Sequence, residues 1–230
     1  MHQNWKEVWE DRAGGPHQES TLAQMMALDG MDSGFADTTE NVWQQFVRHS
    51  AQKMGVYAGA SIFEVGCGAG AYLYEYYKQG FRVGGLDSSA TLLKHARDAM
   101  PSGEWFHGEA CDLETLTRYD FVVSCGVFHY FPSLQYAQEV LKRMASKATT
   151  SVAVLDVPDR ERWGDAMAAR RSKVGEEEYD RRYKGLKHLY YSKEWFQSEL
   201  NGLTKSKIQV EDSNAGWLNS NYRFNVYASR

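Results

Sequence analysis

A glycine-rich loop that carries a carboxylate is the strongest chemical signal in this 230-residue chain. The run is Phe63-Glu64-Val65-Gly66-Cys67-Gly68-Ala69-Gly70, in which three glycines alternate with other residues. Glycine lets the backbone turn sharply and approach a ligand with no Cβ in the way. Asp87 follows the first glycine at a spacing of about twenty residues, where a carboxylate can accept both hydroxyls of a ribose. The pattern predicts a nucleoside-binding site.

Glu64 decides between two kinds of nucleoside ligand. The segment Gly66–Ala71 also satisfies the looser dinucleotide-binding pattern of glycines. Glu64, however, lies two residues before the first glycine, where its charge would repel a pyrophosphate. It would attract a ligand that carries an ammonium and a sulfonium and no phosphate. The alternative for Glu64 is a carboxylate that only caps the local backbone.

Alternating strands and helices must position these residues. Apolar runs that end in glycine, aspartate or serine alternate with stretches of helical spacing, which predicts a parallel sheet with helices on both faces. The two last runs have a short connection, which favours an antiparallel pair at the sheet edge. The predicted fold is α/β, with a doubly wound, mostly parallel, seven-stranded, Rossmann-like sheet. The predicted strands are Ser61–Val65, Phe81–Leu86, Glu104–Phe106, Tyr119–Ser124, Ser151–Val157, Lys205–Val210 and Tyr222–Tyr227.

In the order of these motifs, residues Ala60–Met144 resemble the class I S-adenosylmethionine-dependent methyltransferases. The resemblance implies that the glycine loop lines the methionine and adenosine parts of S-adenosylmethionine and that Asp87 binds its ribose. In Gly108-Glu109-Ala110, Glu replaces the family's usual Asp beside the adenine, so either Glu109 or Asp112 faces the adenine amino group. The end of the fourth strand would face the methyl group. The implied cofactor-binding residues are Trp9, Arg12, Glu64, Gly66, Cys67, Gly68, Gly70, Asp87, Ser88, Glu109, Ala110, Ser124 and Cys125.

The first and last parts of the chain complete one predicted domain. Trp9 and Arg12 resemble a cap helix that covers the cofactor and meets its carboxylate, although Arg12 can also be a solvated charge. Thr38 or Thr39 is a plausible N-cap of the next helix. The mixed-charge run Arg170–Glu178 is interpreted as a solvated helix face, with Arg170 or Arg171 open to a phosphate-bearing acceptor. The predicted parts of the domain, residues 1–230, are a helical cap at 1–58, a cofactor-binding core at 60–157, an inserted lid at 158–200 and edge strands at 201–230.

Methyl transfer from a sulfonium requires alignment of the acceptor and needs a general base only for an acceptor such as a hydroxyl. His129 follows the fourth strand and is the candidate base; the alternative is a packed structural histidine. Tyr130, Tyr190, Tyr191 and Arg223 are candidate substrate-binding residues, with edge-strand packing as their alternative. We expect O-methylation of a small molecule such as a sugar or secondary metabolite. The other readings are N-methylation, an NAD(P)-dependent oxidoreductase and a non-catalytic binding module.

Composition narrows the classes of partner. A formal net charge of −4 and a pI near 6.0 disfavour nucleic acid and anionic membranes as partners. The sequence has no apolar run long enough to span a bilayer and no signal-peptide layout, so we expect a cytoplasmic protein. The three cysteines, Cys67, Cys111 and Cys125, are interpreted as core residues. We expect no metal, and a monomer or a homodimer.

Overall fold

The computed structural model describes residues 4–12, 20–31, 38–203, 207–213 and 220–229 of the chain. Its centre is a seven-stranded sheet with the order β3-β2-β1-β4-β5-β7-β6. Strands β1 to β5 pair in parallel, and β7 lies antiparallel between β5 and β6. The strands are β1 (Ser61–Val65), β2 (Arg82–Asp87), β3 (Glu104–His107), β4 (Tyr119–Cys125), β5 (Ala148–Pro158), β6 (Ile208–Asp212) and β7 (Arg223–Ser229).

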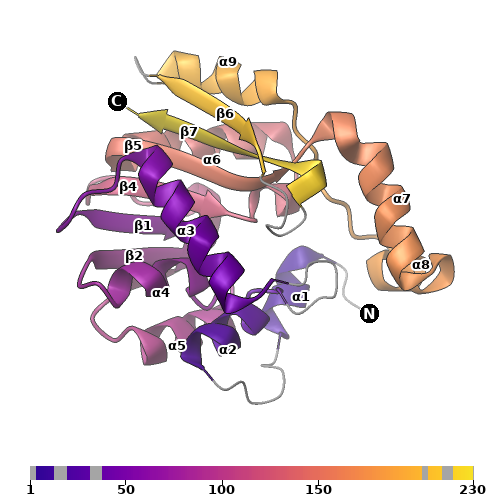
Figure 1. Cartoon of the computed structure of the whole chain (residues 1–230), viewed down its shortest axis with the longest axis horizontal. Helices are drawn as coiled ribbons and strands as arrows, with labels where there is room; N and C mark the ends of the chain where they lie inside the picture. The colour runs from indigo at the N-terminus through magenta and orange to yellow at the C-terminus, as the bar shows by residue number, and fades with distance from the viewer. Residues whose placement is uncertain (1–3, 13–19, 32–37, 204–206, 214–219, 230) are drawn as a thin grey trace.

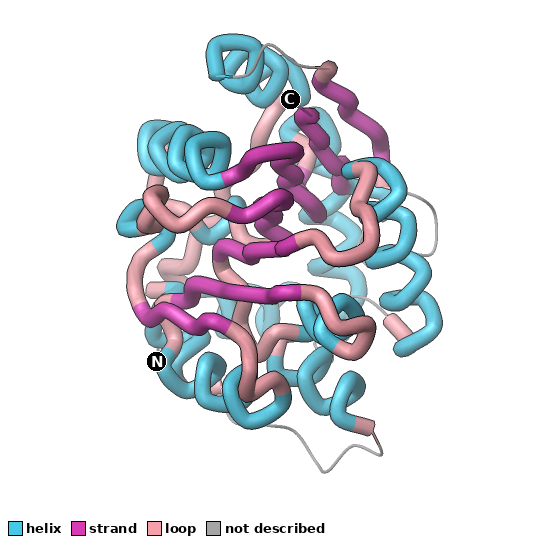
Figure 2. Tube along the Cα trace, turned by 90° about the vertical axis from the view of Figure 1, so that its left-hand side faces the viewer, coloured by secondary structure: helices cyan, strands magenta, loops and turns pink. Residues whose placement is uncertain are grey.

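Helices cover both faces of the sheet and form two separate apolar cores (Figures 1 and 2). On one face, Trp43, Phe46 and Tyr72 pack with residues of α4 and α5. On the other face, Phe128, Leu141 and Phe196 pack against the strands. The sheet helices are α3 (Glu40–Met54), α4 (Ala71–Tyr77), α5 (Ala90–Ala99), α6 (Leu134–Lys147) and α9 (Lys193–Leu203).

The short strand β1 is buried along its whole length because neighbours lie on both edges and helices cover both faces. Its C-terminal end therefore points into the interior of the molecule, directly before the glycine loop. In parallel sheets, ligands bind outside this carboxyl end, where the strand order reverses. Here the reversal falls between β1 and β4, since β2 follows β1 on one side and β4 lies on the other.

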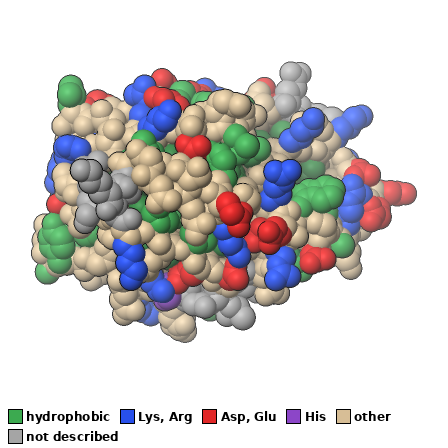
Figure 3. All heavy atoms as spheres, turned by 90° about the horizontal axis from the view of Figure 1, so that it is seen from above, with side chains coloured by type: hydrophobic (Ala, Val, Ile, Leu, Met, Phe, Trp, Pro, Cys, Tyr) green, Lys and Arg blue, Asp and Glu red, His purple; other side chains and the backbone are tan. Residues whose placement is uncertain are grey.

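Two groups of helices stand beside that edge of the sheet (Figure 1). The N-terminal pair is α1 (Trp5–Glu10) and α2 (Thr21–Leu28), and the later pair is α7 (Trp163–Val174) and α8 (Glu176–Tyr183). Asn4 and Ser20 cap α1 and α2, each accepting a hydrogen bond from the third residue of its helix. Elsewhere on the surface, Figure 3 shows basic and acidic side chains interspersed over the face seen from above.

The predicted fold class is confirmed, with the late strands as an antiparallel pair. Thr39 is the N-cap of α3, a position for which the sequence left Thr38 or Thr39 open. Several element boundaries differ from the prediction. Strand β5 begins three residues earlier, at Ala148, because it continues directly from α6 without a turn. Helix α9 extends to Leu203, past the expected start of the edge-strand region, and residues 205 and 206 of the predicted sixth strand lie outside the described part.

Candidate functional site

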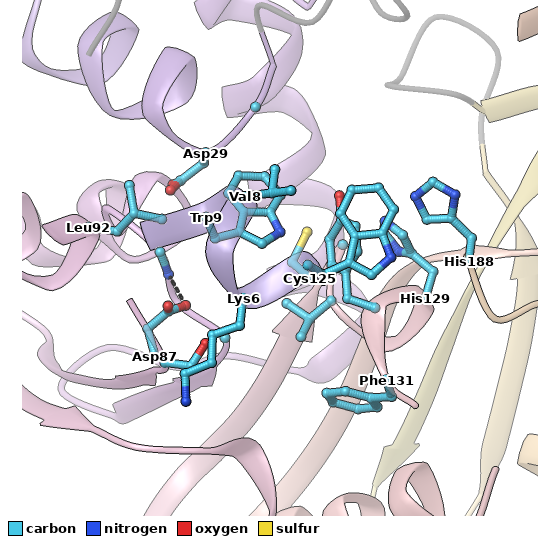
Figure 4. A pocket seen from close by; sticks show the side chains of 18 of the residues that line it. Lys6, Val8, Trp9, Asp29, Asp87, Leu92, Cys125, His129, Phe131 and His188 are labelled. Carbon is cyan, nitrogen blue, oxygen red and sulfur yellow. Dashed lines mark hydrogen bonds between the residues drawn. The ribbon is translucent and has the colours of Figure 1, made fainter. Parts of the chain in front are cut away.

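A pocket of about 610 Å³ opens at the carboxyl ends of β1, β2 and β4. Its size lies within the range of small-molecule sites, about 300–1,000 Å³. The strand ends and the glycine loop form its floor, while residues of α1, α7 and α8 and the three residues that follow α2 also line it. Figure 4 shows Asp29 and Asp87 at one end, His129 and His188 at the other, and Trp9 between them.

The glycine loop has the tight geometry that its sequence requires. Gly66 and Gly68 have φ values of 76° and 52°, in the left-handed region that favours glycine. The Gly66 amide donates to the Leu86 carbonyl at 2.7 Å, which ties the loop to β2. A Cβ on Gly66 would collide with the side chain of Val127. Only glycine at this position lets the loop pack against Val127 in this conformation.

Asp87 lies at the end of β2 and supports the loop directly. Its Oδ2 accepts from the Gly68 amide at 2.8 Å, and its Oδ1 accepts from the Ser89 amide at 2.8 Å. Burial raises the pKa of this carboxyl, and the two backbone hydrogen bonds oppose the rise. Asp87 and the neighbouring Ser88 both line the pocket.

Glu64 is the unusual group of the site, because it is a carboxylate that is only 2% exposed. Its Oε2 is buried and has no hydrogen-bond partner among the described residues. Burial raises the pKa of Glu64 well above its usual range, and the nearby charges of Asp29 and Asp87 raise it further. In the described part of the chain the side chain makes no backbone cap, so the capping alternative is not observed. A buried, unpartnered acceptor that lines a pocket is suited to a cationic donor on a ligand.

Asp29 is a third carboxylate of this end, and the sequence analysis missed it. It is the C-cap of α2, and its Oδ1 and Oδ2 accept from the amides of Ala69 at 2.6 Å and Ala71 at 3.0 Å. Burial raises the pKa of Asp29 to about 7, against these two hydrogen bonds. Only its place in the fold reveals it, since nothing in residues 21–31 marks a ligand-binding acid.

Two cap residues from the prediction, Trp9 and Arg12, line the pocket. The Arg12 guanidinium lies 5.4 Å from the Trp9 ring centroid. Its Nη2 donates to the Ala27 carbonyl at 2.7 Å. The charge of Arg12 also lowers the pKa of Asp29. Arg12 is thus held between α1 and α2 rather than extended into solvent.

The expected adenine end contains Glu109 and Ala110, and both line the pocket. Asp112 is not among the lining residues, so of the two acids left open by the sequence only Glu109 faces this space. Lys6 of α1 forms an ion pair with Glu109, with Nζ and Oε1 2.6 Å apart. This exposed contact links α1 to the loop that follows β3.

The opposite end of the pocket is basic and aromatic. Arg223, at the start of β7, is 5% exposed, and its Nη1 donates to the Asp156 carbonyl at 2.8 Å. The same Nη1 lies 3.4 Å from Asp156 Oδ2 and 3.3 Å from Nδ1 of His129. Ring contacts connect His129 with Tyr130 and His188, at centroid distances of 3.9 and 5.2 Å.

His129 is held as a neutral ring. Burial lowers its pKa well below the usual range, and the charges of Arg223 and Arg170 add to this effect. Because a guanidinium only donates, Nδ1 of His129 accepts and the ring hydrogen lies on Nε2. In this arrangement His129 presents a donor to the pocket, which does not suit the general base proposed from the sequence.

Four of the predicted site residues do not line the pocket. Gly70 is the N-cap of α4 and packs near Met100. The Ser124 hydroxyl donates to the Val65 carbonyl within the sheet, whereas its neighbour Cys125 does line the pocket. Tyr190 has its hydroxyl against Met167 Sδ at 4.0 Å, and Tyr191 is 1% exposed and donates to the Phe128 carbonyl.

Besides Asp29, several pocket residues were not recognised as site residues. Arg170 was interpreted mainly as part of a solvated helix face, and Trp5, Asp156, Tyr183 and His188 were given no site role. Asp156 has a φ of 56°, which is rare for a residue other than glycine. A run of arginines and an aromatic-rich segment were the signals available for Arg170 and His188, but they do not say which side chain turns inward.

The described residues contain neither a membrane-spanning helix nor a cluster of metal ligands. No helix among them is both long and apolar enough to cross a bilayer. No group of three or more His, Cys, Asp or Glu side chains is arranged to hold a metal ion in the same part of the chain.

Comparisons with known proteins agree with this geometry. Residues 62–148 match a family model described as a methyltransferase domain. A trans-aconitate 2-methyltransferase from Azoarcus sp. (strain BH72) is 34% identical over 76 residues, which are 32% of this chain and 30% of that protein. A relative from Geobacillus sp. (strain WCH70) is 27% identical over 109 residues, and the match spans 44% of it. The chain thus aligns with less than half of either curated relative.

Solved structures share the whole fold at low identity. An amino pentose methyltransferase from Micromonospora echinaspora, with bound S-adenosylmethionine, has a TM-score of 0.64 at 12% identity, over 95% of this chain and 99% of that one. A magnesium protoporphyrin IX methyltransferase from Synechocystis PCC 6803 has a TM-score of 0.62 at 15% identity, over 98% and 92%. Residues 62–148 therefore resemble a methyltransferase domain, and the complete sheet has the fold of S-adenosylmethionine-dependent methyltransferases of known structure.

Proposed function

We propose that this protein transfers the methyl group of S-adenosylmethionine to a small-molecule acceptor. The observation that carries the proposal is the unpartnered Oε2 of Glu64, buried beside the carboxylates of Asp29 and Asp87. Three acids at one glycine loop suit a ligand with positive charge and no phosphate. The match of residues 62–148 to a methyltransferase domain supports the same reading.

The residues present fit this ligand. Glu64 offers an acceptor to an ammonium, Asp87 lies where a ribose acid is expected, and Glu109 lines the space expected for the adenine. Trp9 covers the pocket from α1. S-adenosylmethionine supplies an already activated methyl group, so the chain's own task is to align the acceptor and exclude water.

The dinucleotide reading fits less well. A pyrophosphate at the glycine loop would face Glu64, Asp29 and Asp87 together, and the charge of Asp87 already raises the pKa of both other carboxyls. Like charges at such short range oppose binding strongly in a buried site. We therefore favour a methyltransferase over an NAD(P)-dependent oxidoreductase.

For the acceptor, we propose O-methylation. The positive charge of Arg223 and Arg170 near the acceptor end disfavours an ammonium-bearing substrate, and so N-methylation of a basic amine. The hydroxyl expected from the sequence would need a base, and His129 Nδ1 is engaged with Arg223. The nature of the oxygen acceptor is taken up below.

Calorimetric titration of the protein with S-adenosylhomocysteine, S-adenosylmethionine, NAD and NADP tests the proposal. We expect both adenosyl ligands to bind and both dinucleotides to give no heat. Binding of a dinucleotide with no binding of either adenosyl ligand would overturn the assignment. Binding of S-adenosylhomocysteine without turnover on any acceptor would favour the non-catalytic binding module.

A further inference from the structure

The pocket carries opposite charges at its two ends. The end at the glycine loop holds Glu64, Asp29 and Asp87, whereas the other end holds Arg223 and Arg170. Burial lowers the pKa of His129 and of His188, the latter to about 3, and the charges of both arginines add to this effect. Both histidines are therefore neutral at physiological pH, and the arginines set the potential of this end. The one anionic group of the proposed methyl donor is its carboxylate, which we place at Arg12 near the glycine loop, so the donor does not account for a positive region here.

Arg223 has hydrogen-bonding capacity that faces this space. Within the described residues its hydrogen bonds all run from Nη1, to the Asp156 carbonyl and to His129. A guanidinium has five N–H donors in a planar fork, so Nε and Nη2 remain to serve a ligand. Such a fork binds a carboxylate in a bidentate manner, with two parallel hydrogen bonds. His129 and Asp156 hold Arg223 in one orientation for that purpose.

Among the described residues, each candidate base at this end is either engaged with Arg223 or weakly basic. His129 presents its N–H, and the low pKa of His188 makes it a very weak base. Asp156 is ion-paired with Arg223, which lowers the pKa that burial raises. An acceptor whose nucleophilic atom is already anionic needs no deprotonation, so it could react at this end without a general base.

We propose that the acceptor is a small carboxylic acid, bound as its anion by Arg223 and Arg170, and that a carboxylate oxygen receives the methyl group. This inference rests on the proposed methyltransferase function. A carboxylate oxygen forms the new bond to the methyl carbon while the carbon–sulfur bond breaks and its electron pair stays on sulfur. A methyl ester and a neutral thioether result, and no proton is gained or lost.

Aromatic rings at this end suit a flat carbon skeleton. Trp5 lies 4.8 Å from the ring of Tyr130 and 4.5 Å from that of His188, measured between centroids. The Trp5 indole is fixed by a 2.8 Å hydrogen bond to the Lys187 carbonyl. Trp5, Tyr130 and His188 all line the pocket. We therefore expect unsaturated or aromatic acids to be better acceptors than saturated ones of similar length.

The test uses the full chain with S-adenosylmethionine labelled in its methyl group. The acceptors are benzoate, cinnamate and trans-aconitate, each beside its alcohol or amide counterpart. Methyl esters release labelled methanol in alkali, whereas ethers and N-methyl products do not, so the chemistry of the product is read directly. We expect alkali-labile label with at least one acid and none with the matched neutral compounds.

Variants locate the anion subsite. Arg170→Gln and Arg223→Gln should each raise the KM for the acid at least tenfold, with the affinity for S-adenosylhomocysteine within about threefold of wild type. Arg82→Gln, on a surface ion pair with Glu104, is the matched control and should change neither quantity. If Arg223→Gln fails to fold because Asp156 loses its partner, the KM of Arg170→Gln for the acid still tests the anion subsite.

Three results would overturn the inference while S-adenosylhomocysteine still binds. They are alkali-stable label on an alcohol or amine, no label on any acid, and an unchanged KM in Arg170→Gln. Failure to bind S-adenosylhomocysteine would instead overturn the proposed function itself. The two proposals can thus fail separately.

Discussion

The carboxylate of Asp29 accepts a 2.6 Å hydrogen bond from the backbone amide of Ala69, and so joins the end of α2 to the glycine loop. A Cβ on Gly68 would collide with this carboxylate, which shows how closely the two segments approach. The N-terminal helices are therefore part of the ligand site, and the charge of Asp29 couples the site to pH.

Replacing Asp29 with Asn should change how stability depends on pH. The folded-state pKa of Asp29, about 7, lies above its ordinary value of 3.8. Between these values the folded protein keeps a proton that the unfolded chain has lost, so this group's favourable contribution falls as the pH rises toward 7. Asp29→Asn has no carboxyl to titrate at this position, so its stability does not fall in this way. Relative to wild type it should gain on the order of 1 kcal/mol between pH 5 and pH 8 in urea unfolding.

The control for this comparison is Asp98→Asn, in an exposed pair with Lys94 on α5. Its stability difference from wild type should vary little over the same interval. Because Asn supplies one acceptor where Asp29 supplies two, the absolute stability of Asp29→Asn is not the readout. Parallel pH profiles for wild type and Asp29→Asn would contradict the prediction.

Binding of a cationic ligand should release protons. At pH 6 the free site holds a proton on Asp29, whose pKa burial raises to about 7, and burial and the charges of Asp29 and Asp87 raise the pKa of Glu64 as well. A cation favours the ionised carboxylates, so the affinity for S-adenosylmethionine should rise from pH 6 to pH 8. Calorimetry in two buffers of different ionisation enthalpy measures the number of protons. Heats that are the same in both buffers would argue against a protonated acid cluster.

Glu64→Gln should weaken binding of both adenosyl ligands while the fold is retained. The substitution keeps the shape of the side chain and removes the charge that we assign to the ligand's ammonium. Losing one partner of a buried charge pair costs about 2–5 kcal/mol, so we expect affinity to fall by at least about thirtyfold. Glu104→Gln, on the surface beside Arg82, should bind normally. Unaltered affinity in Glu64→Gln would remove Glu64 from the site.

His129 is expected to position Arg223 rather than to carry a proton. His129→Asn can still offer an oxygen to Nη1 of Arg223, whereas His129→Ala cannot. We expect His129→Ala to raise the acceptor KM about tenfold, with kcat within about threefold, and His129→Asn to recover most of that loss. A general base would behave differently. Its removal would lower kcat by about a hundredfold or more, and the wild-type rate would fall in acid with the titration of the ring.

The sequence predicted best those site residues that lie at or just after the carboxyl end of a strand. Glu64, Asp87 and Glu109 all line the pocket, because the carboxyl ends of neighbouring parallel strands meet at one edge. Local spacing was enough to find them. Asp29 and Arg170 come from helices far away in the chain, and only tertiary packing brings them to the same space.

The direction in which a side chain points also limited the prediction of site residues from the sequence. Ser124 and Cys125 are neighbours on β4, and successive strand residues point to opposite faces, so only Cys125 lines the pocket. Tyr190 and Tyr191 lie in an aromatic-rich run whose composition fits a ligand wall as well as a core. Tyr191 packs with Phe128 and Phe196 in the core instead.

The opposed charges of the pocket also bear on how the protein would let its products go. With the acceptor proposed above, each turnover turns a sulfonium into an uncharged thioether and an anion into an uncharged ester. The arginines at the far end would then lose the counter-charge that drew the acceptor in, whereas the acids at the glycine loop would keep the ammonium of the thioether product. A site organised in this way holds its ester product more weakly than its acid substrate, so the ester would inhibit it less than its shape suggests.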